Sequence, residues 1–237
     1  MVGCHRRFLI SIQPFIPMKK TTFALAVSTL TLCALQATAA DIQGFKGATF
    51  GSTEAVVLRS LQTDFDVKPT DVVTTSDVVT GVRKLEVKLP KLEPIEEPAT
   101  LTYLIGYKCK CLVQTNISWA IPEKTSKERR EGAMAAMASL LDHFKKKEWK
   151  ASEVIEGRVA GELKEGVATN YIFFRGTNDR NSSITLWGAP VTILKAKAPA
   201  KGDSELTADV DTINQIVVSY ELDYKTPDIK RFNTTGY

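Results

Sequence analysis

The sequence predicts an α+β fold, in which a mainly antiparallel sheet carries one long amphipathic helix and one short helix. Three observations favour this class. Polar and apolar residues alternate through most of 99–121, as they do in strands with one buried face. The periodicity changes to helical spacing after Pro122. Several strand-like segments joined by short links surround this region, and hairpin-length links favour an antiparallel arrangement over a doubly wound sheet.

Residues 1–40 are predicted to be an N-terminal extension followed by a cleavable secretory signal that begins at Met18. Lys19 and Lys20 form its basic region, and the apolar stretch Phe23–Leu35 is short for a membrane span. The sequence Ala37-Thr38-Ala39 has the small-x-small pattern of a cleavage site. Since such signals direct export, we expect a periplasmic protein.

The mature chain is expected to begin at Ala40 or Asp41 and to contain no transmembrane segment. Removing the first forty residues takes away four basic and no acidic residues, which leaves 27 of each. A net charge of zero argues against binding to nucleic acid or to an anionic membrane surface. Residues 41–225 are predicted to form a single domain with a candidate seam at the proline-rich stretch 90–98, and residues 226–237 a flexible tail.

The first elements of the domain are a short glycine-rich strand within 44–51 and a helix over 53–61 that Ser52 caps. The glycine spacing matches no phosphate-binding motif. Strands are predicted at 71–79 and 82–89, and the prolines of 90–98 then indicate a stiff, exposed connection. Glu96 and Glu97 are adjacent on this polar stretch without a sign of burial, so we do not expect an acid–base pair.

The alternation in 99–121 predicts a hairpin that turns at Lys108–Lys110. A three-residue loop there would set Tyr107 opposite Cys111 and keep the apolar residues of both strands on one face. After Pro122, Thr125 and Glu128 match a capping box, which predicts that a helix begins there and continues to Lys147. Its apolar stripe should lie across the hairpin and consists of Ala133, Met137, Leu140, Leu141 and Phe144.

The remaining strands are predicted at 154–159, 171–174, 183–194 and 213–224. The segment 171–174 is apolar on both faces, which favours a central position in the sheet. Trp187 lies in the strand 183–194. The last strand presents one apolar face, formed by Ile216, Val218, Tyr220 and Leu222.

Cys109 and Cys111 are the candidate chemical feature of the mature chain. Export would place them in an oxidising compartment, where thiols tend to pair. In a straight strand their Cα atoms would lie about 6.5–7 Å apart, at the limit for a disulfide, whereas a tight turn would bring them closer. Three states remain open: two buried free thiols, a local structural disulfide, and a redox-active pair.

The mature chain retains one histidine, His143, and we interpret it as a flank residue of the long helix. A zinc site built from Cys109, Cys111 and His143 would lack a fourth ligand, and the Cys-x-Cys spacing is tighter than usual. We therefore expect no metal, no cofactor and no catalytic residues.

Two stretches resemble uncharacterised periplasmic proteins of Gram-negative bacteria. One is Phe45-x-Gly47-x-x-Phe50-Gly51-Ser52 before a helix, and the other is Gly106-Tyr107-Lys108-Cys109-x-Cys111-Leu112 running into Asn116-x-x-Trp119. The resemblance implies an exported protein and assigns no activity.

Two classes of function follow. The first is a non-enzymatic periplasmic module that binds a protein or an envelope component. The alternative is a thiol redox or accessory enzyme that uses the Cys109-Lys110-Cys111 pair, in which one thiol must be exposed and partly ionised at neutral pH.

Overall fold

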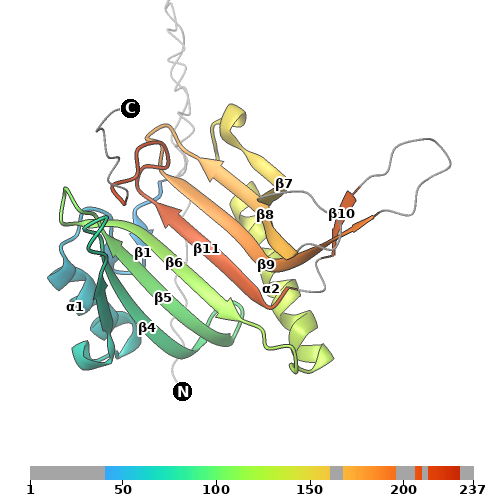
Figure 1. Cartoon of the computed structure of the whole chain (residues 1–237), viewed down its shortest axis with the longest axis horizontal. Coiled ribbons are helices and arrows are strands. Elements are labelled where there is room, and N and C mark those ends of the chain that lie inside the picture. The colour runs from blue at the N-terminus through green and yellow to red at the C-terminus, as the bar shows by residue number, and fades with distance from the viewer. Residues whose placement is uncertain (1–40, 161–167, 196–205, 210–212, 230–237) are drawn as a thin grey trace, which may run out of the picture. The chain divides into compact units, whose positions relative to one another are not determined.

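The structure is a computed structural model that describes residues 41–160, 168–195, 206–209 and 213–229 (Figure 1). These residues form a large antiparallel sheet with two helices, α1 (Glu54–Phe65) and α2 (Lys127–Lys145), which lie behind it in Figure 1. The predicted α+β class with a mainly antiparallel sheet is confirmed. The predicted signal in residues 1–40 and the part of the predicted tail from residue 230 onward lie outside the described residues.

The sheet has nine strands, and its order is not the order of the sequence. From one edge to the other it runs through β3 (Val73–Ser76), β4 (Arg83–Leu92), β5 (Glu97–Ile105), β6 (Leu112–Ala120), β11 (Gln215–Glu221), β9 (Ser183–Lys195), β8 (Ala168–Thr177) and β7 (Ile155–Ala160). The short β10 (Leu206–Asp209) pairs with the end of β9. A separate small hairpin consists of β1 (Gly44–Phe45) and β2 (Ala48–Thr49).

The central strand of the sheet is β11, the last strand among the described residues. It pairs with β6 on one side and with β9 on the other, antiparallel to both. The segment 171–174, which we expected at the centre, lies in β8, one strand from the edge. Its residues 171–173 are only half-buried, so a short run of apolar residues did not by itself indicate a strand buried on both faces.

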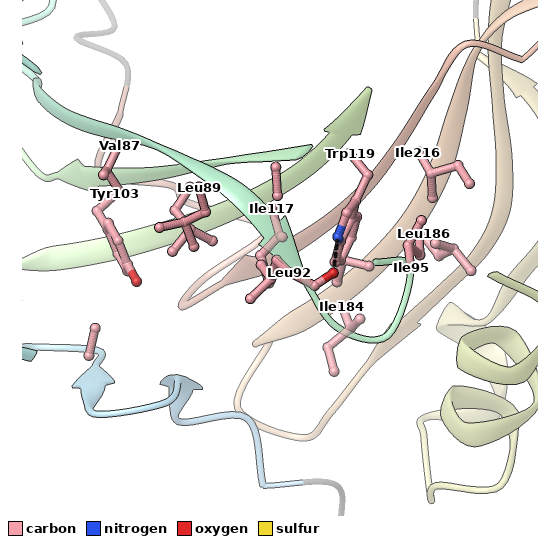
Figure 2. Close-up of a cluster of buried hydrophobic side chains, with 14 of the residues drawn as sticks. Val87, Leu89, Leu92, Ile95, Tyr103, Ile117, Trp119, Ile184, Leu186 and Ile216 are labelled. Carbon is pink, nitrogen blue, oxygen red and sulfur yellow. Dashed lines mark hydrogen bonds between the residues drawn. The ribbon is translucent and has the colours of Figure 1, made fainter. Parts of the chain in front are cut away.

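The hydrophobic core lies between the sheet and the helices (Figure 2). Trp119 on β6 is 1% exposed and its indole Nε1 donates a hydrogen bond of 2.8 Å to the carbonyl of Leu92, as the dashed line in Figure 2 shows. Because a buried indole N–H needs a partner, this bond fixes the end of β4 against the middle of the core. Val57 and Leu61 of α1 and Met137 and Phe144 of α2 belong to the same buried cluster.

The N-cap of each helix lies one residue later in the sequence than the residue we predicted. The N-cap of α1 is Thr53 and not Ser52. The N-cap of α2 is Ser126, whose side chain accepts a hydrogen bond from the backbone N–H of Arg129. The Ser126 carbonyl also accepts the first hydrogen bond of the helix, from the Arg130 N–H, so Ser126 and not Thr125 is the cap. The predicted stripe on α2 is confirmed: Ala133, Met137 and Phe144 are buried, and Leu140 and Leu141 pack against the core half-buried.

The proline-rich stretch 90–98 forms the turn of the β4–β5 hairpin, with most of its residues exposed and Leu92, Ile95 and Glu97 buried. Strand β4 continues to Leu92, which pairs with Glu97 at the start of β5. Glu97 is only 4% exposed, contrary to our prediction, and its carboxylate accepts hydrogen bonds from the guanidinium of Arg129 on α2. A buried carboxylate requires such a partner, so the pair ties the start of α2 to the β4–β5 hairpin.

The burial of α2 predicts a graded response to truncation along its stripe. Met137→Ala should lower the free energy of unfolding by about 2–5 kcal/mol, because a buried side chain is lost and leaves a cavity. Leu140→Ala should cost less, since Leu140 is half-buried. Urea denaturation followed by circular dichroism would measure both, with the exposed Ser139→Ala as control. Equal losses for Met137 and Leu140 would contradict this orientation of the helix.

Candidate functional site

Two regions of the described surface carry groups of side chains that could bind or react with a ligand. The hairpin tip comprises the loop 106–111 between β5 and β6 together with its disulfide. The polar face is the side of the sheet opposite the helices, over β6, β11, β9 and β8. We describe the tip first, since it contains the cysteines that the sequence singles out.

Cys109 and Cys111 form a disulfide bridge, with their Cα atoms 5.1 Å apart. The strand pairing ends at Ile105 and Leu112, so the loop is longer than the predicted Lys108–Lys110 turn. Lys110 adopts a left-handed conformation at φ 53°, which brings the two cysteines closer than a straight strand would. Side-chain alternation alone would place both cysteines on the core face, but in this loop Cys109 is exposed and Cys111 is half-buried.

The C-terminal segment, residues 222–229 after β11, holds the hairpin tip in place through Asp228. Its carboxylate accepts hydrogen bonds from the backbone N–H groups of Lys108 and Cys109, at 3.1 and 3.0 Å. Its own carbonyl accepts one from the Tyr107 N–H. A Cβ atom at Gly106 would lie 2.3 Å from the Asp228 carboxylate, which explains the glycine at this position. Residues 226–229, which we had assigned to a flexible tail, are thus part of the folded structure.

A pocket of about 210 Å³ separates the tip from this segment. Both cysteines line it on one side, and apolar side chains contribute much of the rest: Val113, Leu222, Pro227 and Ile229. The bridge therefore borders a partly apolar pocket at the protein surface.

The C-terminal segment is ordered by a turn at Asp223 and by an ion pair. The Asp223 carboxylate accepts hydrogen bonds from the N–H groups of Lys225 and Thr226, at 2.9 and 3.0 Å. The Lys225 ammonium lies 2.7 Å from Glu153 and donates to it, and this hydrogen bond is the main reason why the pKa of Glu153 is lowered. Partial burial raises the pKa of Asp223, but the hydrogen bonds from Thr226 and Lys225 outweigh it and lower the pKa overall.

The polar face is hollowed over its central strands, with a volume of about 430 Å³. Strand register arranges its side chains in rows across the sheet. One row is polar and consists of Asn116, Ser219, Thr185 and Arg175, taken from β6, β11, β9 and β8. The neighbouring row is largely apolar and consists of Ser118, Val217, Trp187 and Ile172 on the same strands.

Hydrogen bonds among these side chains hold them in place. Arg175 donates through Nε to the Thr185 hydroxyl and through Nη1 to the Tyr224 hydroxyl, at 3.1 and 2.8 Å. Its guanidinium also lies over the Tyr224 ring, 4.5 Å from the centroid. Trp187 Nε1 donates to Ser219 at 3.4 Å. The hollow is therefore lined by side chains whose orientations are already fixed, as preformed ligand sites commonly are.

His143 is exposed near the end of α2, where its ring meets the edge of Phe144. The cysteine sulfurs are joined to each other and so are not free to act as zinc ligands. Within the described ranges, no three His, Cys, Asp or Glu side chains converge to hold a metal ion.

Sequence reasoning did not find Asp228, Arg175 or the rows of the polar face. Alternation had set Gln114, Asn116 and Ser118 on the face opposite the core, which was a usable signal for β6 alone. The rows also require the pairing of β11 with β6 and β9, and no local pattern encodes that pairing.

Comparisons with known proteins found no matching family model, no similar curated protein and no similar solved structure. Across the described residues, no helix combines the length and apolar character that crossing a bilayer requires.

The lowered pKa of Asp223 predicts a stability that depends on pH. Its hydrogen bonds stabilise the fold above about pH 4, the ordinary aspartate value, and this contribution is lost as the pH falls through the lower folded pKa. Asp223→Asn should therefore lower the melting temperature at pH 6 by roughly 1–3 °C.

The difference in melting temperature between Asp223→Asn and the original protein should shrink as the pH falls below about 4. Thermal unfolding followed by circular dichroism measures it, and Glu123→Gln, an exposed change at the other end of β6, is the control. A difference that stays constant down to pH 2 would contradict the assignment.

Proposed function

We propose that this protein is exported to the periplasm and acts there as a non-enzymatic binding module for an uncharged oligosaccharide of the cell envelope. The observation that carries the proposal is the paired arrangement on the polar face, where a row of hydrogen-bonding side chains runs beside a row that contains Trp187.

The chemistry of the hollow suits a polyhydroxylated ligand. Sugar hydroxyls donate and accept hydrogen bonds, as do the amides and hydroxyls of the hollow: Gln114, Asn116, Ser118, Asn170, Thr185, Gln215 and Ser219. The apolar faces of sugar rings can cover the half-buried Trp187 and Ile172. Neighbouring polar side chains already bond to each other, such as Gln215 to Ser118 at 2.6 Å, so little ordering is required on binding.

The charge of the hollow favours a neutral ligand over a charged one. Arg175 and Glu221 are the charged side chains among its lining residues, and they have opposite signs. Arg175 is engaged by Tyr224, and the Glu221 carboxylate accepts a hydrogen bond of 2.8 Å from Ser183. A nucleic acid or an anionic glycan would require several cations in excess.

Export is tested by the N-terminus of the protein recovered from cells. Expression of the full sequence in a Gram-negative host should yield a periplasmic protein that begins at Ala40 or Asp41, because signal peptidase cleaves after small residues such as those of Ala37-Thr38-Ala39. Mass spectrometry of the periplasmic fraction would identify the end. Replacing Ala37 and Ala39 by Leu should retain the uncleaved form. Recovery of an uncleaved original chain in the cytoplasm would contradict export.

Binding is tested by calorimetric titration of the mature protein with neutral tetrasaccharides: chitotetraose, cellotetraose and maltotetraose. We expect at least one to bind, and Asn116→Ala and Trp187→Ala each to weaken it about tenfold or more, which corresponds to about 1.4 kcal/mol. Lys88→Ala is the matched control, since Lys88 is exposed on the same face of the sheet but lies on β4 and does not line the hollow.

Circular dichroism of each variant would establish that the fold is retained. No heat of binding at 10 mM sugar, or equal binding by the original protein and both variants, would overturn the proposal. Binding only to a sulfated or phosphorylated glycan would show that the ligand is charged and overturn it as well.

A further inference from the structure

The Cys109–Cys111 bridge contributes little to holding the chain together. A disulfide restricts the unfolded chain least when the loop it closes is short, and here a single residue separates the cysteines. The tip is also anchored without the bridge: Asp228 binds two of its amides, and Leu112, directly after it, exchanges backbone hydrogen bonds with Gly51 and Ser52. Stabilisation of the fold is therefore a weak explanation for a bridge at this position.

The surroundings of the bridge are those of a reactive group. Cys109 is exposed, and exposed disulfides are the ones that thiols attack. The exposed Lys108 and Lys110 flank Cys109 with two positive charges, which favour the approach of a thiolate, while the Asp228 carboxylate binds the backbone N–H groups of Lys108 and Cys109. The backbone N–H of Cys111 donates to the Cys109 sulfur at 3.1 Å, and this interaction would stabilise Cys109 as the leaving thiolate when a mixed disulfide at Cys109 is resolved.

The adjoining pocket indicates the class of substrate. It is about 210 Å³ in volume, and its apolar lining consists of Val113, Leu222, Pro227 and Ile229 beside both cysteines, with Glu221, Asp223 and Asp228 among its polar lining residues. A space of this kind suits an apolar side chain next to a cysteine in an extended polypeptide. We propose that the Cys109–Cys111 bridge exchanges with the thiols of a cysteine-containing polypeptide that docks an apolar side chain in this pocket. This activity goes beyond ligand binding at the polar face, whose hollow shares Gln114 and Glu221 with the pocket.

The exchange proceeds in two displacements. A substrate thiolate attacks the exposed Cys109 sulfur, the bond between Cys109 and Cys111 breaks, and Cys111 leaves as a thiolate that takes a proton from water. A second substrate thiolate then displaces Cys109 from the mixed disulfide. The substrate gains a disulfide and loses two electrons, which the protein retains as two thiols. A low-molecular-weight disulfide such as oxidised glutathione restores the bridge by the reverse exchange.

The test uses the oxidised mature protein and a synthetic peptide that carries two cysteines flanked by leucine. Acid-quenched mass spectrometry should detect the mixed disulfide and then the reduced protein, formed at least tenfold faster than the same peptide reduces oxidised glutathione at equal concentration. A peptide with serine in place of leucine should react severalfold more slowly, because it cannot fill the pocket.

Two variants identify the cysteine that enters the mixed disulfide, which is the same species whether the thiol or the bridge reacts. Cys111→Ser leaves Cys109, and its thiol should form a mixed disulfide with the oxidised peptide at least tenfold faster than Cys111 does in the matched variant Cys109→Ser. Since both variants lack the bridge, an effect on folding would affect them alike, and circular dichroism would reveal it.

A bridge that survives millimolar dithiol peptide for hours in the folded protein would overturn the proposal. Equal rates for the two single-cysteine variants would overturn the role of Cys109, and equal rates for the leucine and serine peptides that of the pocket. The exchange rates are measured without sugar and the sugar titrations without thiol, so failure of the exchange is distinguishable from failure of the glycan proposal.

Discussion

The backbone pairing of β11 with β6 and β9 holds the two parts of the sheet together. Seven residues of β11 pair with each neighbour. In the sheet order, β3 to β6 lie on one side of β11, and β9, β8 and β7 lie on the other (Figure 1). Without β11, both parts would expose long unpaired edges in the middle of the protein, where Ile216 and Val218 now fill the core. The strand that joins the two parts of the sheet therefore follows both of them in the sequence.

The same pairing produces both candidate sites. Because β11 runs antiparallel to β6, its last residue, Glu221, lies beside Gln114 near the β5–β6 loop, and the chain leaves the sheet next to the disulfide. That exit brings Asp228 to the amides of the tip. In the other direction across the sheet, the register of β11 aligns Asn116 with Ser219 and Thr185, which forms the polar row. One strand thus positions two surfaces of different chemistry.

The candidate sites differ in how much of each could be predicted. Cys109 and Cys111 stand out in the sequence because few cysteines occur in it, yet their exposure did not follow from alternation. The β-pattern ends at Ile105 and Leu112, and beyond it the loop is shaped by Lys110 and by Asp228, which is more than a hundred residues away. Glu97 shows the same limit: it looks solvated in sequence, and only the approach of Arg129 makes its burial tolerable.

The sequence by itself determined the local properties of this protein: the fold class, the periods of its strands, the apolar stripe of α2 and the face of β6 that carries Asn116. These follow from residue spacing along one segment, because side-chain direction depends on backbone period alone. The tertiary structure decided which strand became central, where the cysteines lie and which side chains share a hollow. These outcomes depend on pairing between strands that are far apart in the chain. The free energy of that pairing comes from burying the surfaces of both strands together, so neither strand's sequence determines it alone.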